Sequence, residues 1–398
     1  MHTIGVVCEF NPFHLGHFEH LAESRKALGA DTAVVCVMSG DFVQRGGPAV
    51  FDKHSRARAA VLSGADLVFE LPVPWANASA ERFAMGAVGL LNDLGVVTYL
   101  SFGSESGDLA PLAALALAAA EPENLEKIKG QMTAGMSFAA AREMVLAEAL
   151  GPEAKLLQTP NNILGVEYLK ALFALKSSIK PMTTLRTGAG HDSVTDGPKR
   201  SASQLRAMME AGEDISVYLP EATRGIPADC RSHGRGPVTM AGLEQAVMSR
   251  LRLLSEEDFC ALPDATEGLG NRFYKAVRSE ATVEAVLSAV KTKRYPLSRL
   301  RRMVISAVLG IREDMATKPV PYARLLASTE KGRALLREMG EKSTVPILTK
   351  PAAARELPDE ARQIFELTAA ARDFYVLGYE AAEERKCGSD WRTSPVTL

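Results

Sequence analysis

Three of the seven histidines in this 398-residue chain lie close together near its start, at His14, His17 and His20. They follow a short apolar run, Ile4 to Val7, that is typical of a buried strand, and they surround Gly16 where a helix is expected to begin. Ligands of open parallel sheets bind at the carboxyl ends of the strands, and a helix N-terminus attracts anions. Two imidazoles beside Gly16 would therefore suit phosphate oxygens that gain charge in a transition state.

Three other interpretations of this segment stay open on the residues alone. One is a metal pair, although His20 is turned by about 120° from His14 on a helix and no carboxylate is spaced to complete the site. Another is a capped helix with solvated histidines. The third is a glycine-rich dinucleotide turn, although no G-x-G-x-x-G pattern occurs here.

The bulk composition narrows the class of protein. The net charge is −2, so any nucleic-acid surface must be a local patch. The five cysteines are scattered and form no C-x-x-C pair, which argues against a disulfide framework or a structural zinc site and for a reducing cytosol. No signal-peptide pattern and no membrane-length apolar run is present. We therefore expect a cytoplasmic protein with no membrane partner.

Strands and helices alternate in the first half of the chain. Continuous apolar runs separated by helical periods predict an α/β fold, a doubly wound parallel sheet with helices on both faces. The expected strands are Thr3–Cys8, Thr32–Met38, Asp66–Leu71, Val96–Phe102 and Thr183–Arg186.

Helical periods dominate from about residue 236 onward, and strand-like runs almost vanish. A Gly-, Arg- and Pro-rich stretch, Ser232–Pro237, marks the expected boundary. We therefore predict a catalytic domain over residues 1–232 and a mainly α-helical domain over residues 233–398. One helix of the second domain is expected over Tyr322–Met339.

Two short motifs resemble those of the HIGH-type nucleotidyltransferases. His14-Leu15-Gly16-His17 is similar to their H-x-G-H signature, and residues 199–206, KRSASQLR, are similar to their later S-S-T-x-I-R motif with Ala and Leu substitutions. Longer segments resemble the tRNA(Met) cytidine acetate ligase family over nearly the whole chain: EFNPFHLGH, MSGDFVQRGGPA, DLVFELP, SFGSES, PNNILGVEYLKAL, EGLGNRF, KTKRYPLSRLRR and STVPILTK.

The resemblance implies a two-step ligase reaction with ATP as cofactor and with acetate and elongator tRNA(Met) as partners. Acetate attacks the α-phosphate of ATP to form acetyl-adenylate. The acetyl group then passes to N4 of the wobble cytidine. Mg²⁺ is expected to arrive through the nucleotide phosphates, with no protein-held metal.

Residue roles follow from the same resemblance. His14 and His17 would stabilise the transferring phosphoryl group, Asp41 would orient substrate, and Arg45 would hold the acetate carboxylate; the alternative for Asp41 is the start of a surface turn. The ATP site would include Val7, Cys8, Glu9, Phe10, Asn11, Pro12, Phe13, Leu15, Gly16, Phe18, Glu19 and His20.

Later segments would complete the nucleotide site. Gly103 would let the nucleotide approach the backbone, and Arg186 would end the last strand beside it. Of Asn161 and Asn162, one would cap a helix and the other would contact the nucleotide. Ser203 would cap another helix, with Lys199, Ser201 and Arg206 at the phosphates; an ordinary capped helix with basic decoration is the alternative.

A basic stretch in the second half carries the expected RNA surface. Residues 291–312 contain no acidic residue and have an apolar stripe at helical spacing, so burying the stripe leaves the basic side chains projecting. The expected phosphate contacts are Lys291, Lys293, Arg294, Arg299, Arg301 and Arg302. An ordinary solvated face is the alternative.

Two other functions compete with the ligase. A small-molecule adenylyltransferase of the same superfamily would leave the helical half and its basic stretch unexplained. A tRNA-binding module that has lost catalysis would not need His14 and His17.

Overall fold

The computed structural model describes residues 2–186 and 200–398. Within them, one eight-stranded sheet has the order β10-β8-β5-β2-β1-β6-β7, with β9 paired to β8. Its central strands are parallel, whereas β8 runs antiparallel to β5. The strands are β1 (Thr3–Cys8), β2 (Ala33–Ser39), β5 (Leu67–Leu71), β6 (Tyr99–Ser104), β7 (Lys180–Leu185), β8 (Ala323–Ser328), β9 (Ile347–Leu348) and β10 (Val396–Thr397). A separate ribbon pairs β3 (Phe42–Val43) with β4 (Gly47–Pro48).

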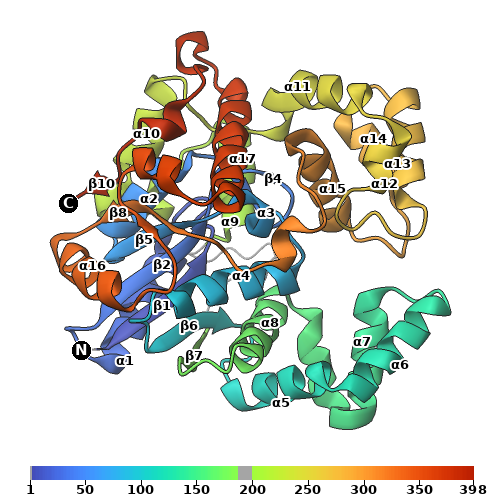
Figure 1. Ribbon diagram of the computed structural model, residues 1–398, viewed down its shortest axis with the longest axis horizontal. Helices are drawn as coiled ribbons and strands as arrows, with labels where there is room; N and C mark the ends of the chain where they lie inside the picture. Colours follow the sequence, from blue (N-terminus) through green and yellow to red (C-terminus); the bar gives the residue numbers. More distant parts are fainter. Residues whose placement is uncertain (1, 187–199) are drawn as a thin grey trace.

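Helices cover both faces of the sheet and form two further groups beside it, α6–α7 and α11–α15 (Figure 1). Their bounds are α1 (Leu15–Leu28), α2 (Lys53–Leu62), α3 (Val73–Ala76), α4 (Ala80–Asp93), α5 (Leu109–Ala120), α6 (Pro122–Thr133), α7 (Phe138–Leu150), α8 (Pro160–Ala174), α9 (Ala202–Glu210), α10 (Gly225–Ser232), α11 (Met240–Leu253), α12 (Glu256–Cys260), α13 (Leu269–Ser279), α14 (Val283–Val290), α15 (Leu297–Leu309), α16 (Glu330–Lys342) and α17 (Asp359–Tyr375). No helix in the described part of the chain is long and apolar enough to cross a membrane.

Strand β2 shows why the sheet needs helices on both faces. All seven of its residues are buried, and successive side chains enter different cores. Val35 and Val37 pack in the core that includes residues of α4, α5 and α8, whereas Val34, Cys36 and Met38 pack in the core that includes residues of α1, α2 and α9. This confirms the α/β fold with a largely parallel sheet that the continuous apolar runs predicted.

The second half of the chain is less helical than expected. The helix predicted over Tyr322–Met339 is wrong, because Ala323–Ser328 form β8 before α16 begins. All six residues of β8 are buried, and it pairs with β5 some 250 residues earlier in the chain. A short apolar run has no periodicity that separates a buried strand from a helix, so this long-range pairing decided its structure.

Candidate active site

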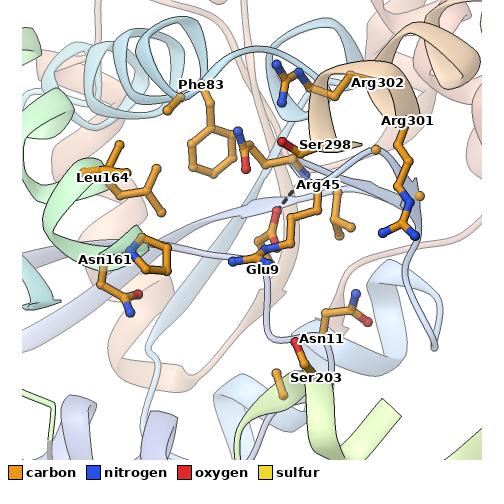
Figure 2. A pocket seen from close by; sticks show the side chains of 18 of the residues that line it. Glu9, Asn11, Arg45, Phe83, Asn161, Leu164, Ser203, Ser298, Arg301 and Arg302 are labelled. Carbon is orange, nitrogen blue, oxygen red and sulfur yellow. Dashed lines mark hydrogen bonds between the residues drawn. The ribbon is translucent and has the colours of Figure 1, made fainter. Parts of the chain in front are cut away.

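A cleft of about 1570 Å³ lies at the carboxyl edge of the sheet. Its walls come from the end of β1, the start of α1, the β3–β4 turn, the starts of α8 and α9, and residues of α7, α14 and α15. The site therefore combines segments from most of the chain, and Figure 2 shows several of their side chains directed into one space.

His14 and His17 are held at the N-terminus of α1 by the backbone. Nδ1 of His14 accepts a hydrogen bond from Gly16 N–H at 3.0 Å, and Nδ1 of His17 accepts one from His14 N–H at 3.3 Å. Their rings are stacked with centroids 3.8 Å apart. Because each Nδ1 is an acceptor, each neutral ring carries its proton on Nε2. The two imidazoles can thus offer Nε2–H donors, and Nε2 of His14 has no protein partner among the described residues.

Burial and neighbouring cations keep these rings neutral. Burial, together with the charges of Arg186 and Arg206, lowers the pKa of His14 to about 3. Burial, His14 and Arg186 likewise hold the pKa of His17 well below its usual range. Burial lowers the pKa of His20 to about 4. The histidines therefore act as neutral hydrogen-bond donors at physiological pH, in keeping with the interpretation as a phosphate-handling pair.

His20 has a different position from the other two. Its Nδ1 lies 2.8 Å from Thr184 Oγ1 on β7, and its Nε2 lies 3.4 Å from Ser101 Oγ on β6. These contacts anchor α1 to the sheet. Among the described residues no group of three or more His, Cys, Asp or Glu side chains is placed to hold a metal, so the three histidines do not form a ligand set.

Lowered histidine pKa values make the stability of the protein depend on pH. The unfolded chain binds protons near pH 6.5, whereas His14 and His20 bind them only near pH 3 and 4 in the folded state. Between these pH values the unfolded state binds more protons than the folded state. The free energy of unfolding is therefore highest above pH 6.5 and decreases as the pH falls. We expect the thermal unfolding midpoint to fall between pH 7 and pH 5, and His20→Gln to flatten that fall. A midpoint that stays constant or rises on acidification would contradict this.

The turn between β3 and β4 brings Arg45 into the cleft. Gln44 N–H donates to Glu9 Oε1 at 2.7 Å, which ties the turn to the end of β1. Gly46 has a φ of 78° and packs so tightly on the α15 backbone at Arg302 that no Cβ would fit. Held from both sides, the turn directs the Arg45 side chain into the space beside Glu9 (Figure 2).

Asp41 lies behind this turn, outside the cleft lining. Its buried Oδ1 accepts hydrogen bonds from Lys53 N–H at 2.8 Å and from Arg372 Nη1 at 3.2 Å. The position of Asp41 does not support the expected substrate contact. These bonds hold Asp41 just before β3, the strand that leads into the Arg45 turn.

Asn161 and Asn162 do different things, and neither side chain caps α8. The N-cap residue is Thr159, which makes no side-chain capping bond. Asn162 is buried, and its Oδ1 accepts hydrogen bonds from the N–H groups of Glu105 and Ser106. Asn161 lines the cleft, where its Oδ1 accepts a hydrogen bond from Arg186 Nη1 at 3.1 Å. Asn161 is thus the one placed to meet a nucleotide.

The Arg186 side chain packs against Gly103 in the cleft wall. A Cβ on Gly103 would lie 2.9 Å from Cγ of Arg186. The absence of a side chain at this position therefore makes room for the arginine, and Gly103 itself lines the cleft.

The later basic motif also reaches the cleft, with one correction. Ser201, not Ser203, caps α9, because its Oγ accepts from Gln204 N–H and the Gln204 side chain bonds back to Ser201 N–H. Ser203 instead accepts a hydrogen bond from Arg206 Nη2 at 3.0 Å, and Arg206 Nη1 donates to the Asn11 carbonyl at 2.8 Å. Lys199 lies outside the described residues.

Comparison with known proteins agrees with this geometry. The HIGH Nucleotidyl Transferase family matches residues 1–390. A tRNA(Met) cytidine acetate ligase of Caldanaerobacter subterraneus subsp. tengcongensis is 40% identical over 389 residues, which cover 96% of each chain. One of Acetivibrio thermocellus is 37% identical over the full length of both. The chain belongs to the tRNA(Met) cytidine acetate ligase family.

A solved structure of this family matches the whole chain. The crystal structure of Thermotoga maritima TmcAL bound with alpha-thio ATP superposes with a TM-score of 0.94 at 34% identity, covering 100% of both chains. The apo form of the same protein gives a TM-score of 0.95.

Most of residues 7–20 line the cleft, but three of them do not. Phe13 is buried against Phe10, Phe18 is 41% exposed on the outer side of α1, and Pro12 is buried; none of the three belongs to the lining. Pro12 and Phe13 therefore belong to the packed interior behind the cleft, and Phe18 faces away from it.

Glu105, Phe83 and Tyr168 are among the cleft residues that were absent from the sequence-based set. Glu105 contacts the start of α8, and Phe83 and Tyr168 are nearly buried apolar walls whose surfaces reach the cleft. Burial, with Glu9 nearby, raises the pKa of Tyr168, so its hydroxyl stays protonated. Glu105 lies in SFGSES and Tyr168 in PNNILGVEYLKAL, the two segments that already carried the resemblance.

The basic stretch, residues 291–312, divides into exposed and internally bonded residues. Lys291, Lys293 and Arg301 are exposed, and the last two line the cleft. The other three are held by the loop before α13: Arg294 bonds to Glu267, Arg299 to the Asp264 carbonyl at 2.7 Å, and Arg302 to Asp264 Oδ2 at 3.2 Å. Arg302 is only 8% exposed. These three also line the cleft, but each makes hydrogen bonds to this loop, so their contact with RNA phosphates stays a prediction.

Proposed function

We propose that the protein is an ATP-dependent ligase that activates acetate as acetyl-adenylate and transfers the acetyl group to N4 of the wobble cytidine of elongator tRNA(Met). The observation that carries the first step is the stacked His14–His17 pair, whose Nε2–H donors are fixed by the backbone at a helix N-terminus. Such donors suit charge that develops on phosphate oxygens. The relatives' names and the nucleotide-bound relative support the substrates.

In the first step an acetate oxygen attacks the α-phosphorus and the bond to the β-phosphate breaks, releasing pyrophosphate. His14 and His17 donate hydrogen bonds to the oxygens that gain charge, and Arg206 at the start of α9 adds positive charge. Arg45 is placed to hold the acetate carboxylate, because it enters the cleft beside Glu9 on a turn held at both ends. Mg²⁺ would arrive bound to the phosphates and offset their charge.

In the second step the cytidine N4 amine attacks the acetyl carbonyl carbon, AMP leaves, and the amine loses a proton. The wobble base must be splayed out to reach the sheet edge. The volume of the cleft, about 1570 Å³, and its lining by residues of α6, α7 and α15 suit this entry. Lys293 and Arg301 on its rim would then contact the RNA backbone.

One experiment separates the candidate functions: the protein is incubated with radiolabelled acetate, ATP and bulk tRNA. Label in tRNA supports the ligase. Adenylylation of a phosphorylated cofactor precursor without acetylated RNA would favour a small-molecule adenylyltransferase. RNA retention without ATP turnover would point to a binding module that has lost catalysis.

The exposed basic residues predict how tRNA affinity and its salt dependence change when one of them is removed. We expect Lys293→Ala and Arg301→Ala each to weaken tRNA binding and to reduce the slope of log K against log salt by about 1, as the loss of one phosphate contact requires. Arg312→Ala is a matched control, because Arg312 is exposed, pairs with Asp314 and lies outside the cleft lining. Filter binding at several salt concentrations measures the slopes. Slopes unchanged in both cleft variants would place the RNA surface elsewhere.

A further inference from the structure

The carboxylate of Glu105 closes the N-terminus of α8. Its Oε1 accepts hydrogen bonds from Asn161 N–H at 3.3 Å and from Asn161 Nδ2 at 2.6 Å, and its Oε2 accepts one from Asn162 N–H at 2.8 Å. Asn162 Oδ1 bonds back to the N–H groups of Glu105 and Ser106, at 3.0 and 3.2 Å. The loop after β6 and the first turn of α8 therefore hold each other in place.

This contact decides which way the Asn161 amide faces. Because Nδ2 donates to the carboxylate, Oδ1 must point to the other side, where Arg186 Nη1 donates to it at 3.1 Å. The reversed amide would set a carbonyl oxygen against a carboxylate and an NH₂ group against a guanidinium, and both contacts would be repulsive. One negative side chain thus orients an amide, and the amide orients an arginine at the cleft wall.

The same carboxylate also occupies the anion site of a helix. The positive end of α8 faces the cleft at Pro160 and Asn161, and such an end would otherwise attract a phosphate. With Glu105 there, a second anion would be repelled. The starts of α1 and α9, with His14 and Arg206, are then the places left for the triphosphate.

We propose that Glu105 is a positioning residue of the nucleotide site, which aims Arg186 through Asn161 without itself contacting the nucleotide. This inference rests on the proposed ATP-dependent function. It predicts that Glu105 and Asn161 act as one unit in nucleotide binding.

A double-mutant cycle on the full-length protein tests this unit. We expect Glu105→Gln and Asn161→Ala each to weaken ATP binding by about tenfold, as the loss of a hydrogen bond to a charged group implies. The double variant should bind no more than about twofold more weakly than Asn161→Ala alone, because residues in one network are not additive. Calorimetric titration with ATP measures the affinities. Asp108→Asn is the matched control, since Asp108 caps the neighbouring helix α5 from the same loop and lies outside the cleft lining.

A merely structural role for Glu105 gives different results. Effects that multiply to about 100-fold in the double variant would mean independent action, and would overturn the proposal. Glu105→Asp keeps the charge at α8 but shortens the reach to the Asn161 amide, so it should also weaken ATP binding while the unfolding midpoint stays near that of the unmodified protein. If Glu105→Asp binds ATP as tightly as the unmodified protein, only the negative charge at α8 matters. That result would reject the proposal that Glu105 orients Arg186 through Asn161. If the unmodified protein fails to bind ATP, the proposed function falls together with this inference.

Discussion

Replacing His14 by asparagine should remove most of the activity while leaving the fold intact. Asparagine is a favoured N-cap residue, so it can accept the Gly16 N–H bond that His14 Nδ1 accepts at 3.0 Å. It has no group where the Nε2–H of His14 faces the cleft. We expect acetyl-adenylate formation to fall by about 100- to 1000-fold, the usual effect of removing one preorganised donor. Acetate-dependent exchange of labelled pyrophosphate into ATP, with tRNA present, measures the step.

Two companion variants sharpen this result. His17→Ala should give a loss of the same order, because it removes the second donor and the ring stacked 3.8 Å from His14. His233→Ala is the control, since His233 lies exposed at the end of α10, outside the cleft lining. tRNA binding and the unfolding midpoint should be nearly unchanged in His14→Asn. Retention of more than a tenth of the exchange rate, or an equal loss of tRNA binding, would show that the histidines do not serve the adenylation step.

Replacing Lys53 by methionine should produce the largest loss of stability. Lys53 is fully buried, and its Nζ lies 2.7 Å from Glu70 Oε1 and 2.5 Å from Asp390 Oδ2. Arg324 joins the same two carboxylates, at 3.1 and 2.7 Å. The four charges cancel, and methionine would leave one negative charge unpaired in the interior. Breaking a buried pair in this way costs about 3–5 kcal/mol, which urea unfolding would measure.

The control and the rescue distinguish charge from packing. Lys127→Met removes an exposed pair with Glu123 on α6 and should leave the unfolding curve unchanged. Lys53→Met combined with Glu70→Gln restores neutrality and should recover part of the lost stability. If Lys53→Met is as stable as Lys127→Met, the four buried charges do not contribute to the stability of the fold. The expected loss also reflects connectivity, because Asp390 near the C-terminus ties α2 and β8 to each other.

Prediction from sequence succeeded for features that depend on a few consecutive residues. The strand–HLGH–helix pattern predicted the position of His14 and His17, because a local run of residues sets a strand end, a cap and a helix start. The same holds for the basic motif before α9, although its cap is Ser201 rather than Ser203. The expectation for Tyr322–Met339 failed because pairing with β5 is not encoded locally.

Charged residues were the hardest to assign from sequence. Asp41 and Arg302 look like free side chains in the sequence, yet the structure pairs them with Arg372 and Asp264 from distant segments. Glu105 was not among the candidate residues, yet both of its carboxylate oxygens accept hydrogen bonds from the start of α8. Whether a charge meets a ligand or another charge depends on which segments fold beside it.

The sequence by itself determined the fold class, the strand–HLGH–helix motif and the family, because apolar periodicity and short motifs act over a few consecutive residues. Only the tertiary structure decided that Asn161 faces the cleft and Asn162 does not, that Lys293 and Arg301 are exposed while Arg302 is bonded internally, and that β8 completes the N-terminal sheet. The physical reason is that partners of buried polar groups come from any part of the chain, and each must be satisfied once water is removed.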